Sequence, residues 1–409
     1  MNLAVDLHSH SGYAGGVGKI SLQDISTTMK KKGIDLFGTG DALLPERYTE
    51  LERVLIPVGN GLFKLAEDDS SLFMLQTEVI FTTQISGYKN RIVAHHVILF
   101  PSFKAIKEMA KLMTKWGQKN SIGRPFIVSE NREVMISRFF EIQAIDESIE
   151  IIPAHIMTPD GVLGCKNMLI NLEQFYGEFL PNIHAIETGL SADPVMLEKI
   201  PQISHLTFLS NSDCHSAALN RIGREFTILD VKTISYIDII KAIRANSVVL
   251  TAEFNPAEGR YYKTGHAAKR HTTDESFLLD GELPDGVLCP ICDKKMVIGV
   301  YDRIKQLQDD TIIPLKRQFI QMIPLVEVVA YSLNLKSVKS KKVVEMYESI
   351  IEIFGSEIAL WLSDKSRIIE LLDKSVAKKT MKAIISIKEG NFRFDPPGYD
   401  GEYGNLIIE

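Results

Sequence analysis

The chain begins with the stretch Leu3-Ala4-Val5-Asp6-Leu7-His8-Ser9-His10, in which a short apolar run leads directly into two histidines. An apolar run without polar alternation is typical of a strand that is buried on both faces, as in a parallel sheet. Because alternate residues of an extended strand point to the same side, His8 and His10 can bind one ion from a single strand end. This stretch therefore predicts a buried strand that delivers metal ligands where it ends.

Similar runs recur along the first 255 residues, at 34–38, 72–77, 94–100, 149–154, 183–187, 206–210 and 248–251. Between them lie candidate helices with plausible N-caps. Ser21 can cap 22–32, Ser235 can cap 236–246, and Asp193 precedes a proline suited to the first helical turn. Repeated strand–helix units predict an α/β fold, either a parallel barrel or a parallel sheet.

Composition and periodicity divide the remaining chain into two parts. Residues 256–302 are rich in glycine and proline and show little periodicity, which predicts a small module that is not held together by an apolar core. Residues 303–409 are expected to form a C-terminal domain of amphipathic helices, including 340–354 and 364–389, and end in a tail rich in glycine and tyrosine. The predicted domains are therefore 1–255, 256–302 and 303–409.

Residues of the metal-binding type follow almost every apolar run of the first domain. They are Asp41, Glu78, the pair His95-His96, His155, Asp213 and His215. Imidazole and carboxylate groups suit Zn, Mn and Fe, and a carboxylate can bridge two ions. Only one of two adjacent strand residues can face the interior, so His95 and His96 are alternatives. His184 and His205 start their runs instead, and we expect them to be ordinary structural histidines.

The bulk properties exclude several classes of protein. The chain has 409 residues with 46 basic and 52 acidic side chains, a net charge of −6, which argues against a uniformly cationic nucleic-acid binder. Four cysteines do not make a disulfide framework in a chain of this length. We find no signal peptide and no apolar run long enough to span a membrane, so we expect a cytoplasmic protein without membrane contact.

Several of these motifs together resemble the polymerase-and-histidinol-phosphatase (PHP) family. They are Asp-Leu-His-Ser-His at 6–10, Glu78, the stretch from His96, Pro-Ala-His at 153–155 and Ser-Asp-Cys-His at 212–215. The resemblance implies a distorted (β/α)7 barrel that holds metal ions and hydrolyses phosphoesters. Gly-Thr-Gly-Asp at 38–41, Glu-Thr-Gly-Leu-Ser at 187–191, Gly-Val-Tyr-Asp-Arg at 299–303 and the motif at 398–404 resemble the endonuclease Q group of that family.

The resemblance also implies roles for individual residues. His8, His10, Glu78 and Asp213 would bind one divalent metal (Zn, Mn or Mg), with Glu78 shared. His96, preferred over His95 on this ground, would bind a second metal with His155. His215 and Asp41 would approach a third position and, with Asp213, take part in catalysis. Ala42 stands where most members of the family have a histidine, which puts a third metal in doubt.

The small module carries a separate metal signal. Cys289 and Cys292 form a C-x-x-C half-site for zinc. The family places a second cysteine pair upstream, but this chain offers His266 and His271 there. We expect one structural zinc bound by these four residues; the alternative is a degenerate module with a free thiol pair.

The implied activity is that of a DNA repair endonuclease. It would use metal-activated water to cut the phosphodiester 5′ to deoxyinosine, deoxyuridine, deoxyxanthosine or an abasic site, leaving 3′-hydroxyl and 5′-phosphate ends. A nucleoid-associated cytoplasmic location would follow, and any replication or repair partner protein is left open. Two alternatives are a small-molecule phosphatase of the same family and a catalytically silent DNA-binding scaffold.

The damaged base would be flipped out of the duplex, because its pairing edge is hidden inside. Glu187, Ser191 and Asn211 are the candidates for contacting it, since an amide offers both a donor and an acceptor. The alternative is that these groups brace the metal ligands. Lysine clusters at 104, 107, 111 and 115 and at 336, 339, 341 and 342 could contact phosphates, although we expect the first to be an ordinary solvated helix face.

Overall fold

A computed structural model of the chain describes residues 1–14, 20–266, 288–289, 292–399 and 401–409. Its main sheet contains β1 (Asn2–Asp6), β2 (Leu36–Gly38), β3 (Leu55–Gly59), β4 (Leu62–Leu65), β5 (Asp68–Thr83), β6 (Ile92–Phe100), β7 (Phe126–Val128), β8 (Glu150–Pro153), β11 (Phe226–Asp230), β12 (Val248–Glu253) and β13 (Phe319–Gln321). Strands β9 (Ala185–Glu187) and β10 (Thr207–Leu209) form a separate parallel pair. Each of the eight predicted apolar runs overlaps a strand.

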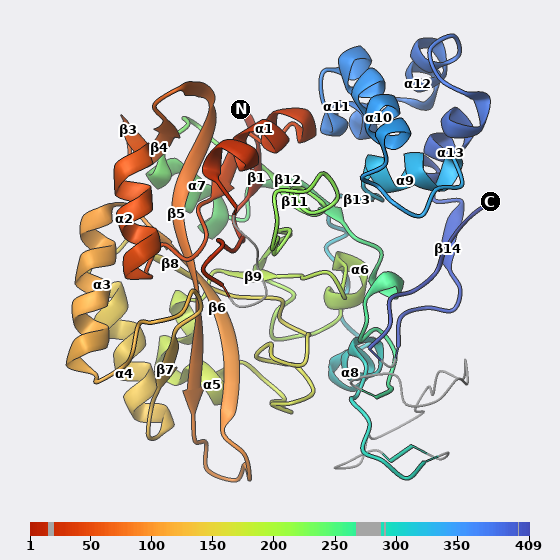
Figure 1. Cartoon of the computed structure of the whole chain (residues 1–409). Helices are drawn as coiled ribbons and strands as arrows, with labels where there is room; N and C mark the ends of the chain where they lie inside the picture. Colours follow the sequence, from red (N-terminus) through yellow and green to blue (C-terminus); the bar gives the residue numbers. More distant parts are fainter. Residues whose placement is uncertain (15–19, 267–287, 290–291, 400) are drawn as a thin grey trace.

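Helices accompany this sheet. They are α1 (Leu22–Lys32), α2 (Pro45–Val54), α3 (Phe103–Lys115), α4 (Arg132–Gln143), α5 (Glu173–Tyr176), α6 (Pro194–Leu197), α7 (Tyr236–Arg244) and α8 (Val300–Leu307), with 3₁₀ turns at Gly177–Asn182 and Pro256–Glu258. The predicted caps are confirmed: Ser21, Asp193 and Ser235 accept hydrogen bonds from backbone N–H groups of the first turns of α1, α6 and α7. Helices α2, α3 and α4 line one outer side of the sheet (Figure 1).

The sheet is mixed rather than parallel throughout. β1–β2 and β2–β5 pair in parallel, whereas β1–β11, β5–β6 and β6–β8 pair antiparallel. The α/β class is therefore confirmed. The closed seven-stranded barrel stays a prediction, because the described hydrogen bonds run as a path from β13 to β3, with β6, β7 and β8 branching from β5 and β9–β10 apart.

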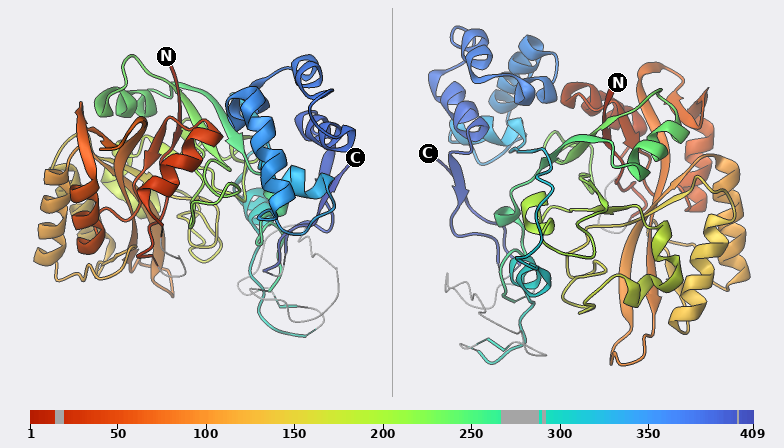
Figure 2. Two further views of the ribbon diagram at one scale, coloured as in Figure 1. Left: turned by 45° about the horizontal axis from the view of Figure 1, so that its top comes forward. Right: turned by 180° about the vertical axis from the view of Figure 1, so that it is seen from behind.

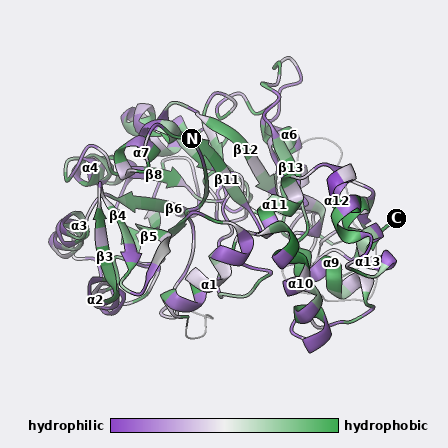
Figure 3. Ribbon diagram, turned by 90° about the horizontal axis from the view of Figure 1, so that it is seen from above, coloured by the Kyte–Doolittle hydropathy of each residue, from purple (hydrophilic) through white to green (hydrophobic). Residues whose placement is uncertain are grey.

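Apolar side chains fill both faces of this sheet. Phe37, Phe73 and Phe81 belong to one buried cluster, and Val5 and Met74 belong to another. In Figure 3 the strands are mainly green, whereas the helices carry purple on parts of their surface. Any polar group on these strands is therefore removed from water and must be held by specific partners.

The C-terminal region is helical, as predicted. It contains α9 (Leu325–Ser332), α10 (Lys341–Phe354), α11 (Glu357–Leu362), α12 (Lys365–Leu372) and α13 (Lys378–Lys388), followed by the antiparallel hairpin of β14 (Phe392–Phe394) and β15 (Leu406–Ile408). The helix expected at 364–389 is two helices, because residues 373–377 form turns between them. None of the described helices combines the length and apolar character that crossing a membrane requires.

The helical region lies next to α1 (Figures 1 and 2), and polar contacts join it to the rest of the molecule. Lys32 of α1 and Glu357 of α11 form a buried ion pair at 2.8 Å, and Asn220 donates to Glu327 of α9 at 2.7 Å. The helices therefore pack against α1 and against the loop that follows His215. The domain boundaries at 255 and 302 remain predictions.

Candidate active site

His8 and His10 lie just beyond the end of β1, where the chain approaches the loop after β10. His10 N donates to Cys214 O at 3.0 Å, and Ser9 bridges Cys214 as an isolated parallel pair. Asp6 does not reach the histidine rings; its carboxylate accepts from Ser212 N at 2.9 Å and Gly223 N at 3.0 Å. The first strand and the 212–215 loop are therefore held together, which places their side chains in one cluster.

Four buried polar atoms converge in this cluster. His10 Nε2 lies 3.2 Å from Asp213 Oδ1 and 3.3 Å from Glu78 Oε2, and His8 Nε2 lies 3.6 Å from Asp213 Oδ1. None of these four atoms has a hydrogen-bond partner among the described residues. Unpaired buried polar atoms are costly, and a divalent cation among them would satisfy all four. The donor set, with two imidazoles and two carboxylates, fits a divalent metal.

A second group shares Glu78. Its Oε1 lies 2.8 Å from His95 Nδ1 and 3.3 Å from His155 Nε2, on the opposite oxygen from the one that faces His10. Burial alone would raise the pKa of Glu78, but His95, His10 and His155 lower the pKa well below its ordinary value. Glu78 therefore lies between two groups of possible ligands, and its role as a ligand shared by two ions stays a prediction.

A third group of possible ligands contains His10, Asp213 and His215. The rings of His10 and His215 have centroids 4.5 Å apart, and the His215 side chain is 39% exposed. His215 is therefore the most exposed member of this group. Burial, as the largest cause, lowers the pKa of His215.

Outer partners fix the orientation of the two histidines. His8 Nδ1 contacts both oxygens of Glu187 at 3.0 Å, and His10 Nδ1 lies 3.2 Å from Asp41 Oδ1. With Nδ1 held in this way, Nε2 of each ring faces the cluster. Although burial opposes it, the carboxylates of Glu187, Asp213 and Glu78 raise the pKa of His8 to about 9.

These contacts bear on the predicted roles of Asp41, Glu187 and Asn211. Asp41 lies behind His10, where its carboxylate also accepts from Ser11 N at 2.7 Å, rather than at a separate metal position. Glu187 and Asn211 are buried behind His8; the Asn211 amide donates to Glu187 at 2.8 Å and accepts from Leu7 N at 2.6 Å. Since their polar atoms are already engaged, this placement favours bracing over contact with a base. Ser191 is also buried, in the loop after β9.

The structure places His95, and not the predicted His96, beside Glu78. His96 Nε2 lies 2.6 Å from Tyr176 Oη, and its ring packs among the aromatic rings of Phe81, Phe139 and Phe175. Burial lowers the pKa of His96 to about 3, so the ring is neutral. In the β5–β6 ladder Glu78 pairs with Val97, and residues two apart share a face, so His95 and not His96 lies on the side of Glu78.

The backbone at three of these residues adopts an uncommon conformation. Asp41, His155 and Asp213 have φ values of 52°, 31° and 44°, in the left-handed region that residues other than glycine rarely adopt. Such strain collects at functional sites, where the surrounding structure enforces it. Arg224 supports the 212–214 loop by donating from Nε to Ser212 O at 2.9 Å.

Arg124 is a site residue that sequence reasoning missed. Its Nη1 lies 3.6 Å from Glu78 Oε2, and the side chain is 33% exposed. It comes from a loop with no apolar run to mark it. A glycine–arginine pair at 123–124 was the only sequence signal, and Gly123 lies against the Asp41 carboxylate, where a Cβ would approach within 2.8 Å.

The small module brings three of its four predicted zinc ligands together. One ligand atom from each of His266, Cys289 and Cys292 lies within 4.8 Å of the others, and His266 Nε2 is 3.3 Å from Cys292 Sγ. His271 lies outside the described residues. The geometry suits a zinc site, whose fourth ligand remains a prediction.

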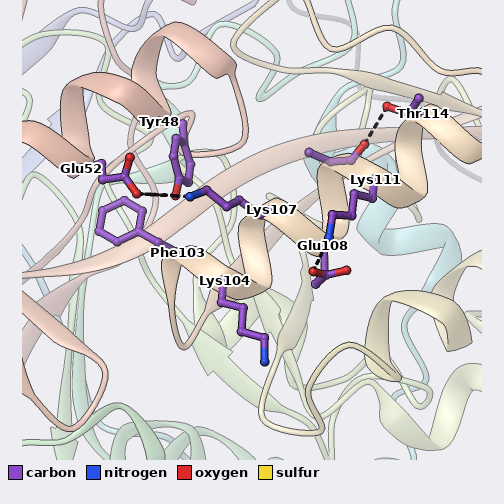
Figure 4. Close-up of a pocket in the computed structure, with 9 residues that line it drawn as sticks. Tyr48, Glu52, Phe103, Lys104, Lys107, Glu108, Lys111 and Thr114 are labelled. Carbon is purple, nitrogen blue, oxygen red and sulfur yellow. Dashed lines mark hydrogen bonds and ion pairs between the residues drawn. The ribbon is translucent and has the colours of Figure 1, made fainter.

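The first lysine cluster is a solvated helix face of mixed charge. Lys107 pairs with Glu52 at 3.4 Å, Lys111 with Glu108 at 2.7 Å and Lys115 with Glu141 at 2.6 Å. Figure 4 shows two of these pairs beside Tyr48 and Phe103. Such pairing leaves little net charge for a phosphate backbone. In the second cluster, Lys341 lies 3.7 Å from Glu345.

Two solved structures match the chain over its whole length. The lesion-specific endonuclease Q of Pyrococcus furiosus matches with a TM-score of 0.81 and 28% identity, covering 100% of this chain and 96% of that one. A complex of endonuclease Q with a 27-mer duplex, which carries an abasic lesion at the active site, matches with a TM-score of 0.83 and 28% identity, covering 100% and 97%. The chain has the fold of endonuclease Q.

Sequence comparisons match the chain to one family model and to two uncharacterized proteins. Residues 324–390, which contain α9 to α13, match the family model of the MJ0043 C-terminal domain. The uncharacterized protein MJ0043 of Methanocaldococcus jannaschii is 32% identical over 231 residues, which is 55% of this chain but 28% of that protein. The uncharacterized protein YqxK of Bacillus subtilis is 25% identical over 417 residues, 98% of both chains. The chain therefore spans only about a quarter of the archaeal relative.

Proposed function

We propose that the chain is a metal-dependent DNA repair endonuclease. It cuts the phosphodiester 5′ to deoxyinosine, deoxyuridine, deoxyxanthosine or an abasic site, and leaves 3′-hydroxyl and 5′-phosphate ends. The observation that carries the proposal is the match along the full chain to an endonuclease Q bound to abasic duplex DNA. Beside β1, four buried atoms converge that have no hydrogen-bond partner among the described residues, and they supply a site for the chemistry.

The metal ligands in this proposal are His8, His10, Glu78, Asp213, His95, His155 and His215. They form overlapping groups that share Glu78 and His10, which suits two or three neighbouring ions. Divalent metals bound there would lower the pKa of water to give a nucleophile near neutral pH and would offset the charge of the attacked phosphate. A structural zinc held by His266, Cys289, Cys292 and His271 belongs to the same proposal.

The protein's own groups have distinct tasks around this centre. Glu187 and Asp41 hold the rings of His8 and His10, so the ligands are oriented before the substrate arrives. Arg124 is partly exposed at the edge of the cluster, where its guanidinium can contact a phosphate oxygen of the cut strand. His215 is more exposed, and its role in this proposal is to stabilise the departing 3′-oxygen.

Base recognition requires the lesion to leave the duplex. The phosphodiester must reach a buried cluster, and a base beside it cannot be read along its pairing edge while it is stacked. We therefore include base flipping in the proposal. Of the three residues first considered for base contact, the buried Glu187 and Asn211 are assigned to bracing, and Ser191 remains as a candidate.

The test compares DNA with small phosphates. Labelled duplexes that carry one abasic site, deoxyuridine, deoxyinosine or deoxyxanthosine are incubated with the metal-loaded protein beside a panel of sugar phosphates and histidinol phosphate. The proposal expects one nick on the 5′ side of each lesion, and a DNA ligase should reseal that nick because its ends are 3′-hydroxyl and 5′-phosphate. Turnover of the small phosphates alone would support a phosphatase, and binding of DNA without a cut would support a silent scaffold.

A further inference from the structure

A surface of aromatic and basic side chains lies beside the active-site loops and has no part in the chemistry proposed above. We call it the aromatic–basic surface, and its residues are Arg260, Tyr261, Tyr262, Tyr301, Lys305 and Tyr403. They come from the segment after β12, from α8 and from the C-terminal tail, which run side by side in both views of the molecule (Figures 1 and 2). Segments far apart in the sequence therefore supply these rings and cations.

Three close backbone approaches connect this surface to the metal cluster. A Cβ on Gly189 would lie 2.5 Å from the Cβ of His155, so the loop after β9 rests on a candidate ligand. A Cβ on Gly259 would lie 2.8 Å from Ser191 Oγ in that same loop, and one on Gly398 would lie 1.9 Å from Gly259 O. The segment that carries Arg260 therefore packs on the loop after β9, and that loop packs on His155.

Backbone hydrogen bonds hold the segment 260–263 between its two neighbours. On one side, Val300 N donates to Tyr261 O at 2.8 Å and Tyr301 N donates to Tyr262 O at 3.0 Å. On the other side, Gly401 N donates to Arg260 O at 3.3 Å and Lys263 N donates to Gly398 O at 3.1 Å. A surface fixed in this way loses little conformational freedom when a ligand binds.

The side chains combine rings with cations. The Arg260 guanidinium lies 5.8 Å from the ring centroid of Tyr261 and 5.7 Å from that of Tyr403, and its Nε donates to Gly401 O at 2.6 Å. Lys305 Nζ lies 4.7 Å from the Tyr301 ring, whose centroid is 5.5 Å from that of Tyr262. Tyr403 is 59% exposed, so its ring is available for stacking.

We infer that the aromatic–basic surface binds the DNA strand that continues beyond the cut site. Bases stack on aromatic rings irrespective of sequence, and adjacent Arg and Lys side chains neutralise the phosphates; this combination is common where proteins bind unpaired strands. A flipped nucleotide leaves its neighbours without one stacking partner, and the base faces exposed in this way can stack on such a surface. The inference rests on the proposed function, because it requires DNA at the metal cluster.

The experiment measures DNA binding without turnover. Full-length protein that carries Asp213→Asn is titrated against a fluorescent abasic duplex at several salt concentrations. The same titration is repeated with Tyr403→Ala, Tyr403→Phe or Arg260→Ala introduced as a second substitution. Arg53→Ala is the matched control for loss of one positive charge, since Arg53 is exposed at the end of α2 on the other side of the sheet (Figure 1). Hydrolysis of bis-p-nitrophenyl phosphate by the same variants with Asp213 intact reports the metal centre.

Stacking predicts that Tyr403→Ala weakens binding about tenfold and that Tyr403→Phe, which keeps the ring, does not. Arg260→Ala should reduce the slope of log affinity against log salt by about one, whereas Tyr403→Ala should leave that slope unchanged. Hydrolysis of the small diester should be unaltered in both. Binding by Tyr403→Ala and Arg260→Ala as tight as that of Arg53→Ala would overturn the inference. Failure of the parent protein to bind the duplex would instead overturn the proposed function.

Discussion

Replacing Glu187 by glutamine should weaken metal binding at the neighbouring cluster while hardly changing the volume of the side chain. The two carboxylate oxygens accept hydrogen bonds from three groups: His8 Nδ1 at 3.0 Å, Asn211 Nδ2 at 2.8 Å and His155 N at 3.0 Å. A carboxamide offers one oxygen, so at least one buried donor would face an NH₂ group. An unsatisfied buried donor costs ~1–3 kcal/mol.

The lost hydrogen bond would leave the His8 ring less firmly oriented, and Nε2 of that ring faces the cluster. Loss of the outer partner of a metal-bound histidine typically lowers metal affinity about 10- to 100-fold. We therefore expect Glu187→Gln to bind Mn²⁺ about 10- to 100-fold more weakly, as measured by calorimetry on metal-stripped protein. Cleavage at subsaturating metal should fall equally for abasic, deoxyuridine and deoxyinosine duplexes, because the bracing role does not involve the base.

Glu150→Gln is the matched control. Glu150 is buried at the start of β8 and also holds a histidine, with Oε1 2.9 Å from His184 Nδ1 and Oε2 2.7 Å from Arg244 Nε. The same substitution there should lower the melting temperature without changing metal affinity, since His184 is not in the cluster. If Glu187→Gln binds Mn²⁺ normally and loses cleavage only at the deaminated bases, the base-contact role is right and the bracing role is refuted.

Three further predictions concern other parts of the molecule. His95→Ala should lower the metal content and abolish cleavage, whereas His96→Phe should keep the metal content, because His96 faces Tyr176; elemental analysis giving the reverse pattern would restore His96 as the ligand. Cys289→Ser should remove one equivalent of zinc and leave Mn²⁺ binding in the first domain intact; unchanged zinc content would show that the module is not a metal site. Burial, followed by the charge of Glu327, raises the pKa of Glu258 from 4.5 to about 8. Between these two values the folded protein binds more protons than the unfolded chain, so the free energy of unfolding should fall as pH rises from 4.5 to 8. Glu258→Gln should flatten this fall in chemical unfolding curves, and an unchanged slope would contradict it.

The strands of the first domain could be predicted because burial on both faces leaves a simple pattern. Each run without polar alternation became a strand, and the N-caps at Ser21, Asp193 and Ser235 marked real helices. Strand direction could not be predicted in the same way. Antiparallel β11 and β6 join a sheet that repeated strand–helix units suggested would be parallel, since the pairing of strands far apart in sequence depends on contacts that no local pattern records.

The candidate site was predictable where spacing alone decides which way a side chain points. His8 and His10 share a face for that reason, and Glu78, His155 and Asp213 join them as expected. The choice between His95 and His96 depended on the register of β5 against β6, which only the folded ladder fixes. Arg124 comes from a loop, where no periodicity singles out a residue. Glu187 and Asn211 were placed near the cluster correctly, but whether they face solvent or His8 is a property of packing.

The central claim is that the cluster around Glu78 is a metal centre that cuts damaged DNA, and one measurement tests it most directly. Wild-type and Asp213→Asn proteins are stripped of metal and incubated with a 5′-labelled duplex that contains a single abasic site, before and after Mn²⁺ is restored. Because a metal site supplies several kcal/mol of transition-state stabilisation, the account predicts a nick at the lesion only in wild-type protein and only after Mn²⁺ is added. Cleavage at the lesion by metal-free wild-type protein, or by Asp213→Asn at the wild-type rate, would contradict it.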